Sequence, residues 1–532
     1  MGIDELVANY VKKHKSVFII GLLLFIAGLI CHGYMLFNKL PNFDEAGSVN
    51  GFLGIATPHG RWALPFTGIL NGPFSSPAIN GSLSIFFIIL SVFLISDILK
   101  INSNLAILCI GLVLVSFPTV TSSLTFMFMC FAFMASLFLE VLAVWLAVTD
   151  LPFFTKYKKA TYVLAVCVMA GGLGIYQAYY QVACALVLLY GLQLFIKEEK
   201  QPVAKSACKL LSLLILGMAV YYIMAKIGCI YTGKEMEVSY GASSIPELIK
   251  NIPHAFLRCY SNFVSIFISD FRGISFNWIL RIFLFVLVLG GIVLYEYLLF
   301  AKHKNLLLGN FMLLLLPLTL GVIGFTMTSR GLDTLTIFSY SFLVVFPFAI
   351  LRAADGILKP KISNILLGIA LIISFLTAWQ YAILSNNVYT TMDIAKTEAM
   401  SYYTTMITQI KSTEGYADDL SVCLLGTESS DQAVYDLSDY YRGDVRGQMT
   451  CNRFINMYSR YYFLSVFLGF DSDFIDWEDY CQAASDDTLK ILEEMSPYPD
   501  AGSIKIVNDT IVIKISDDYK EGAVENKLEW RD

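Results

Sequence analysis

The chain has 532 residues and a formal net charge of −6, and 56% of its residues are hydrophobic, whereas a typical soluble domain is about 45–50% apolar. The excess lies in long runs with few charges, which indicates membrane-spanning helices and excludes an ordinary soluble enzyme. Residues 390–532 hold 27 Asp+Glu against 12 Lys+Arg, whereas residues 1–389 hold 16 against 25. This division predicts a transmembrane domain over 1–389 and a small soluble domain over 390–532.

Eleven apolar segments of about 17–25 residues are each long enough to cross roughly 30 Å of hydrocarbon, which predicts a polytopic α-helical membrane protein. They lie near 17–37, 80–98, 104–122, 124–148, 160–176, 178–196, 206–228, 278–300, 305–325, 333–352 and 363–385. The stretch 160–196 is too long for one helix. The sequence GGLGIYQAYYQ within it predicts a break and a very short turn between two spans.

Lysine and arginine concentrate in the short loops on one side of these spans. The positive-inside rule therefore predicts a cytoplasmic N-terminus, and an odd number of spans places the C-terminus outside. Two long outer loops follow, over 38–79 and 229–277. In the second, SSIPELIKNIPHAFLRCYSNFVSIFISDF predicts one or two amphipathic helices along the outer membrane interface.

The acidic tail is predicted to be an extracytoplasmic α/β domain. Residues 393–412 predict a helix, LSVCLLGT a buried strand and SDDTLKILEEM a capped helix. SIKIV and TIVIKI flank Asn508-Asp509, which predicts a β-hairpin. The chain has no CxxC pair, P-loop, HExxH motif or His/Asp metal cluster, so we expect no metal, no cofactor and no nucleic-acid binding.

An acidic pair and an arginine stand in the first outer loop. Asp44 and Glu45 follow the first span by about seven residues; Asp44 is a candidate general base that Glu45 could orient, unless the pair is only solvated loop surface. Arg61 presents a planar fork that suits a phosphate, or it snorkels at the interface beside Trp62. His59 could titrate near neutral pH or lie on a polar surface.

A second group of candidates lies farther along the chain. Tyr176, Gln177 and Tyr180 fall at the predicted break between two spans, where tyrosine and glutamine suit sugar hydroxyls, although aromatic packing is the simpler alternative. Arg330 occupies a short outer turn, where it could hold a phosphate or pair locally with Asp333.

Other charged residues carry weaker signals. Glu140 lies inside the fourth span, where a hydrogen-bonded packing role is the simplest interpretation. Arg258, Asp270 and Arg272 lie in the second outer loop and are interpreted as interfacial charges.

These motifs together resemble a known family. An acidic pair at the outer end of the first span, followed by a large loop and many further spans, resembles the GT-C superfamily of membrane glycosyltransferases. FDEAGSVNGFLGIATPHGRW resembles the first-loop signature of the Gtr-type serotype-converting glucosyltransferases, and IYQAYY is similar to their mid-chain Tyr-Gln motif. PYPDAGSIKIVNDTIVIKIS resembles their C-terminal segment. Many members have Asp-Asp where this chain has Asp44-Glu45, which leaves the role of Glu45 open.

The resemblance implies an inverting transfer of a hexose, with glucose expected, from undecaprenyl phosphate to a surface polysaccharide such as O-antigen. A metal is not obviously required, because arginine can neutralise a phosphate leaving group. The reaction would take place on the outer face of a bacterial cytoplasmic membrane. A separate synthase and a separate flippase would supply the lipid-linked donor. Asp44 would be the base beside Glu45. The resemblance also implies that Arg61 and Arg330 contact the donor phosphate. Five further residues would contact the substrate: His59, Trp62, Tyr176, Gln177 and Tyr180.

Two other functions fit part of this pattern. A transporter or flippase for a lipid-linked sugar would also need arginines near the membrane surface and a groove for lipid. It would not need an acidic pair in the first outer loop or a large extracytoplasmic domain. A non-catalytic subunit of an envelope complex is the third possibility.

Overall fold

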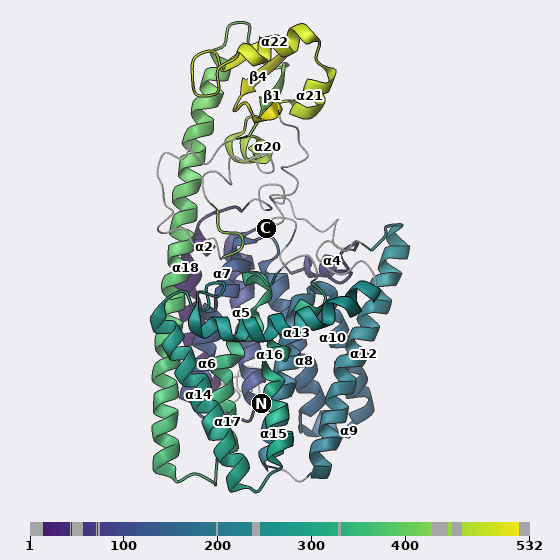
Figure 1. The fold of residues 1–532 in the computed structure, drawn as a ribbon, viewed down its shortest axis with the longest axis vertical. Helices are drawn as coiled ribbons and strands as arrows, with labels where there is room; N and C mark the ends of the chain where they lie inside the picture. Colours follow the sequence, from purple (N-terminus) through teal and green to yellow (C-terminus); the bar gives the residue numbers. More distant parts are fainter. Residues whose placement is uncertain are drawn as a thin grey trace, which may run out of the picture. The chain divides into compact units, whose positions relative to one another are not determined.

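Helices make up most of the computed structural model (Figure 1). It describes residues 14–42, 44, 57–70, 72, 75–197, 200–236, 245–327, 331–427, 445–449 and 460–520. The chain divides into two compact units. Unit 1 comprises Met1–Lys39, Asn50–Asn387 and Gly443–Arg446, and unit 2 comprises Leu40–Val49, Val388–Arg442 and Gly447–Asp532.

Eight helices among the described residues are long and apolar enough to cross a membrane, as expected of a polytopic membrane protein. They are α2 (Lys15–Phe37), α5 (Pro77–Ile98), α8 (Cys130–Val148), α10 (Lys158–Ile175), α11 (Tyr180–Lys197), α12 (Lys200–Thr232), α14 (Trp278–Ala301) and α18 (Pro360–Lys411). A ninth span results if α6 (Asn104–Ser116) and α7 (Pro118–Thr125), which meet at 41°, count as one. The predicted spans over 305–325 and 333–352 form shorter apolar helices, over Leu306–Leu320 and Phe338–Ala353.

Apolar side chains face outward from these helices, and polar side chains are paired within the bundle. Phe285 on α14 and Ile372 on α18 are exposed, as expected of helices that contact hydrocarbon. Inside, Gln193 Nε2 on α11 donates to the carbonyl oxygens of Leu99 (3.0 Å) and Ala349 (2.8 Å). One amide thus ties α11 both to the end of α5 and to α17 (Phe342–Ala353), because an apolar surrounding leaves no water for such groups.

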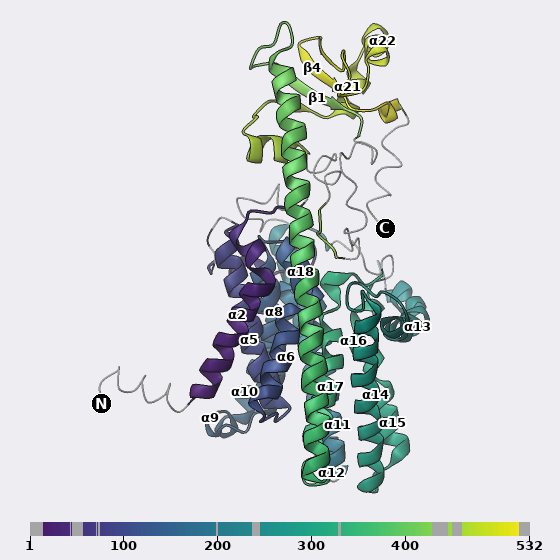
Figure 2. The ribbon, with the colours of Figure 1, turned by 90° about the vertical axis from the view of Figure 1, so that its left-hand side faces the viewer.

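Short and irregular elements complete unit 1. They are α4 (Leu64–Thr67), α9 (Pro152–Lys156), α15 (Leu306–Leu314), α16 (Leu316–Leu320) and the 3₁₀ segments η1 (Gln177–Tyr179), η2 (Val322–Phe325), η3 (Thr334–Thr336) and η4 (Phe338–Ser341). Helix α13 (Ile245–Ile268) confirms the predicted amphipathic helix. It runs across the spans, and like α4 it lies at the end of the bundle opposite α9 (Figures 1 and 2).

Helix α18 corrects one prediction. A span over 363–385 and a separate helix over 393–412 were expected, but α18 continues without interruption for 52 residues and passes from unit 1 into unit 2. The polar segment between the two expected helices contains neither glycine nor proline. The polar residues there end the apolar stretch, but without a helix-breaking residue the helix itself continues.

Unit 2 contains a four-stranded sheet in the order β2-β1-β4-β3. Strand β1 (Ser421–Leu425) pairs in parallel with β2 (Phe474–Ile475) and β4 (Thr510–Lys514), and β3 (Ile504–Val507) is antiparallel to β4. The other elements are α20 (Arg460–Tyr462), η6 (Phe463–Phe467), α21 (Trp477–Ala483), α22 (Asp486–Glu494) and η7 (Asp518–Lys520). The buried core consists of Cys423, Leu425, Trp477, Leu492, Met495, Val507 and Val512.

Three predictions for the tail are confirmed by this sheet. The buried strand is β1, and the capped helix is α22, whose preceding Ser485 accepts a hydrogen bond from the Thr488 N–H through its hydroxyl. The hairpin joins β3 to β4 through Asn508 and Asp509, with φ of +49° and +58°. Two successive positive φ angles are the geometry of a tight type I′ turn, which asparagine and aspartate tolerate better than other non-glycine residues.

Candidate active site

The first outer loop is fixed to unit 1 by a tight turn over Thr57–Gly60. The Gly60 N–H donates to the Thr57 carbonyl oxygen at 2.9 Å, and Gly60 has φ of +73°. A Cβ at this position would lie 2.5 Å from Tyr221 Oη on α12 and 3.2 Å from Gln177 Nε2. Both the backbone conformation and the close approach therefore require glycine here.

Gln177, at the break between α10 and α11, holds this turn. Its Nε2 donates to the His59 carbonyl oxygen (2.9 Å) and to Tyr221 Oη (2.8 Å). The break itself confirms the predicted interruption: α10 ends at Ile175, Tyr176 is extended, and η1 begins at Gln177. Two segments that are more than 100 residues apart in the chain are thereby joined through a side-chain amide.

Trp62 and the next residue extend the contact between the loop and the break. The Ala63 N–H donates to the Gly174 carbonyl oxygen at 2.9 Å. The indole of Trp62 covers Gly174 so closely that a Cβ there would lie 2.5 Å from Trp62 Cε2. Glycine at the end of α10 is thus needed to admit the indole, and the loop lies directly on the break.

Arg61 is held at this junction by an aromatic ring. Its guanidinium carbon lies 5.1 Å from the centroid of the Tyr176 ring, a cation–π distance, and Tyr176 in turn packs on Phe133 of α8 with centroids 4.3 Å apart. Arg61 is half-buried, its Nε has no hydrogen-bond partner, and no carboxylate among the described residues forms an ion pair with it. A cation in this state can bind an anion without first losing an ion pair.

Ser136 on α8 supports the break from behind. Its hydroxyl lies 2.8 Å from the Gly172 carbonyl oxygen and 3.0 Å from that of Tyr176, the two backbone acceptors on either side of the interruption. Irregular backbone within an apolar bundle needs such internal partners. Sequence reasoning missed Ser136, because nothing in its own segment shows which backbone it faces.

Glu140, one turn farther along α8, is fully buried against Gly172. A Cβ at Gly172 would lie 2.7 Å from Glu140 Oε1, and the backbone of Leu173 is its polar neighbour. The structure therefore agrees with the expected packing of Glu140, but its carboxyl oxygens make no hydrogen bond of standard geometry among the described residues.

The remaining predicted site residues have different surroundings. Tyr180 Oη donates to the Leu214 carbonyl oxygen at 3.2 Å, so its hydroxyl joins α11 to α12. Asp44 is half-buried, and its backbone N–H donates to Asn42 Oδ1 at 2.9 Å. Its role as a base stays a prediction. Glu45 and Arg330 lie outside the described residues.

Asp333, the expected local partner of Arg330, has a partner from a distant part of the sequence. Its carboxylate lies 3.4 Å from Arg446 Nε and also caps η3 by accepting from the Leu335 N–H. The Arg446 carbonyl oxygen accepts from Ser122 on α7 at 2.6 Å. The segment around Arg446 is thus attached to the helical unit at the same end as α7 and η3.

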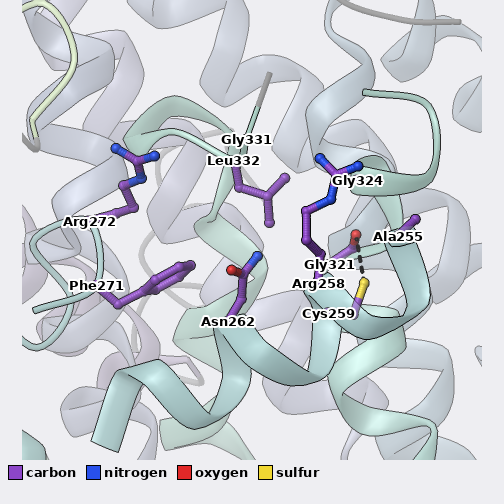
Figure 3. A pocket seen from close by; sticks show the side chains of 10 residues that line it. All are labelled: Ala255, Arg258, Cys259, Asn262, Phe271, Arg272, Gly321, Gly324, Gly331 and Leu332. Atoms are coloured by element: carbon purple, nitrogen blue, oxygen red, sulfur yellow. Dashed lines mark hydrogen bonds between the residues drawn. The ribbon is translucent and has the colours of Figure 1, made fainter. Parts of the chain in front are cut away.

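Two arginines that sequence reasoning treated as interfacial charges line a pocket together. Arg258 on α13 and Arg272, just beyond that helix, flank Asn262 and Leu332 (Figure 3). Their spacing in sequence gave no signal of this, because the third wall of the pocket comes from Gly321, Gly324, Gly331 and Leu332. The pocket adjoins Gly331, which follows Arg330 in the chain.

A family model described as Glucosyl transferase GtrII matches residues 33–352 of the chain. The match covers more than half of the chain, and it includes the Arg61 loop, the break at Tyr176 and the pocket lined by Arg258 and Arg272. No curated protein and no solved structure matches the chain.

Proposed function

The chain belongs to the glucosyl transferase GtrII family, and from this premise we propose that it transfers glucose from undecaprenyl-phosphate-glucose to a hydroxyl of a surface polysaccharide. The observation that carries this proposal is the Arg61 loop. It brings Arg61, which has no carboxylate partner among the described residues, against Tyr176 and beside the hydrogen-bonded Gln177, in a bundle of helices long enough to span a membrane. A lipid-anchored sugar phosphate presents its charge and its hydroxyls at such a position.

The chemistry follows from these groups. The acceptor hydroxyl oxygen attacks the anomeric carbon, and the carboxylate of Asp44 takes the proton from that hydroxyl. The bond between the anomeric carbon and the phosphate oxygen breaks, and the electron pair leaves with polyprenyl phosphate. The configuration at the carbon is inverted in this single displacement. Glu45 would orient Asp44 or the acceptor.

The leaving phosphate gains negative charge as that bond breaks, so a positive group fixed nearby lowers the barrier. Arg61 is the candidate for this role among the described residues, with Arg330 as a further candidate. His59, Trp62, Tyr176 and Gln177 surround the Arg61 position and would contact the donor sugar, and Tyr180 would shape the wall behind them. No metal is required in this scheme, because arginine can neutralise a phosphate monoester.

The location and partners belong to the same proposal. The reaction would occur on the outer face of a bacterial cytoplasmic membrane, with O-antigen or a similar envelope glycan as the acceptor. A separate synthase would make the donor on the inner face, and a separate flippase would deliver it. The soluble unit 2 would then help to bind the acceptor glycan.

Purified full-length protein tests the proposal directly. With undecaprenyl-phosphate-glucose and an acceptor glycan, the wild-type protein should release undecaprenyl phosphate and form the glucosylated acceptor. Asp44→Asn keeps the shape of the side chain but removes the base, so we expect a loss of at least 100-fold in turnover, within the range of about 10²–10⁴ that a general base supplies.

Two results would contradict the scheme. Full turnover by Asp44→Asn would remove the proposed base while leaving glucose transfer in place. Movement of the lipid-linked sugar across reconstituted vesicles, without any transfer to acceptor, would instead establish the transporter alternative.

A further inference from the structure

A cavity of about 70 Å³ lies between α13, the turn after it and a third wall made of Gly321, Gly324, Gly331 and Leu332 (Figure 3). Two of its lining residues are arginines, Arg258 and Arg272, and none is Asp or Glu. The α13 side is formed by Ala255, Arg258, Cys259 and Asn262, which recur at helical spacing and so share one face of the helix. The cavity therefore carries positive charge with no carboxylate in its wall to balance it.

Arg258 is anchored at the side of this cavity. Its Nη2 donates to Asn251 Oδ1 at 2.9 Å, and its Nη1 lies 3.5 Å from the Met327 carbonyl oxygen. Asn251 in turn donates to the Phe325 carbonyl oxygen at 3.2 Å. A guanidinium has five N–H donors, so this anchoring fixes the plane of Arg258 and leaves donors for a ligand.

Arg272 stands opposite, on an unusual stretch of backbone. Arg272 has φ of +50° and Gly273 has φ of +77°, and the two residues reverse the chain between α13 and α14. The Arg272 side chain is exposed and makes no hydrogen bond or ion pair within the described residues. Its Nη2 lies 3.7 Å from the position of a Cβ on Gly331, so it reaches the wall formed by that segment. An exposed arginine thus lies across the cavity from an anchored one.

The other face of α13 indicates where an anion would come from. Ile249, Ile252 and Phe256 are exposed and alternate with the residues that line the cavity. A helix with an apolar exposed face and a cationic face, lying across the spans, has the character of a helix at the lipid interface. This character favours an anion that is attached to a lipid.

We propose that Arg258, Asn262 and Arg272 bind the phosphate group of a membrane lipid. This position shares no residue with the candidate active site around Arg61. The cavity has room for a few water molecules, a space that a phosphate group can also occupy. Arginine forks and an amide are the donors that phosphate oxygens accept from. The choice of polyprenyl phosphate as the favoured lipid rests on the proposed function, because sugar transfer releases that lipid and it needs a place to bind.

Binding to the purified full-length protein in detergent tests this proposal without any turnover. Native mass spectrometry would measure undecaprenyl phosphate, phosphatidylglycerol and inorganic phosphate in turn. We expect at least one lipid phosphate to bind the wild-type protein, and Arg272→Gln and Arg258→Gln each to weaken it about tenfold or more, as the loss of a charge-assisted hydrogen bond does. Lys250→Gln removes a charge from an exposed position on the same helix that does not line the cavity, and should leave binding unchanged.

The two lipids distinguish the source of the phosphate: selective binding of undecaprenyl phosphate assigns the cavity to donor or product, and equal binding of phosphatidylglycerol assigns it to bilayer lipid. Equal affinity for inorganic phosphate, or no loss of lipid binding in Arg272→Gln, would overturn the proposal. If Arg258→Gln fails to fold, the exposed Arg272 decides alone. A protein that binds lipid phosphate here but transfers no glucose would refute only the proposed function.

Discussion

A methyl group at Gly60 is expected to release the first outer loop from the break at Tyr176. Alanine at φ of +73° costs about 1–2 kcal/mol in backbone strain. Its Cβ would also lie 2.5 Å from Tyr221 Oη and 3.2 Å from Gln177 Nε2, so the bond between those two groups must break, at a net cost of about 1 kcal/mol. Docking of the loop should therefore weaken by about 2–3 kcal/mol in total.

A native cysteine reports on this docking. Cys229 on α12 is buried, and its Sγ lies 3.6 Å from the Thr57 carbonyl oxygen, so the docked loop covers it. Modification by maleimide requires the loop to open. Because each 1.4 kcal/mol changes an equilibrium constant about tenfold, Gly60→Ala should raise the labelling rate of Cys229 by about 30- to 150-fold. Peptide mapping by mass spectrometry separates Cys229 from the other cysteines.

The chain offers a matched control for this experiment. Gly72 has nearly the same φ, +74°, but nothing lies within 4 Å of a Cβ there, so Gly72→Ala introduces the strain without the clash. It should change Cys229 labelling by less than threefold. In a Tyr221→Phe background the hydroxyl is gone, so Gly60→Ala should raise the labelling rate of Cys229 by a smaller factor than it does in the wild type. Equal labelling of the two alanine variants would refute the docking argument.

Two further predictions concern other parts of the fold. Ser136→Ala leaves the carbonyl oxygens of Gly172 and Tyr176 without their side-chain donor and should lower stability by about 1–3 kcal/mol. The control is Ser91→Ala, because the Ser91 hydroxyl bonds to the Phe87 carbonyl oxygen of its own helix; it should lower stability by less in the same thermal-unfolding assay. Equal losses of stability would contradict the role of Ser136. Asp509→Val places a β-branched residue at φ of +58° and should speed hydrogen exchange across β3 and β4, whereas Asp509→Gly should not.

The sequence predicted the elements whose signals are local. Length and hydropathy located the spans, GGLGIYQAYYQ located the break, and Asn508-Asp509 located the hairpin turn, because glycine, asparagine and aspartate act on the backbone where they stand. The continuity of α18 could not be predicted in this way, since hydropathy shows where a helix leaves the apolar phase and not where it ends. A helix end needs a breaker or a cap, and the polar segment between the two expected helices contains no breaker.

The site was predictable in its members and not in its contacts. Arg61, Tyr176 and Gln177 were named from residue type and predicted depth, and the structure brings them together. Arg258 and Arg272 were named but assigned to the surface. Their shared cavity depends on a segment some 50 residues later in the chain, and no periodicity within one element can reveal such a wall.

The polar side chains that form the candidate site of unit 1 lie where its helices are interrupted, and there is a physical reason for this. At the end that carries α13, α6 bends into α7 by 41°, α10 breaks before α11 and α16 gives way to η2. Each interruption frees backbone groups that an apolar bundle must satisfy internally, which brings hydroxyls and amides such as Ser136 and Gln177 to this end. The same interruptions give up helix packing and leave space for a loop and a cavity. A polar site for a lipid-linked substrate and the irregular backbone that encloses it therefore have a common origin in these breaks.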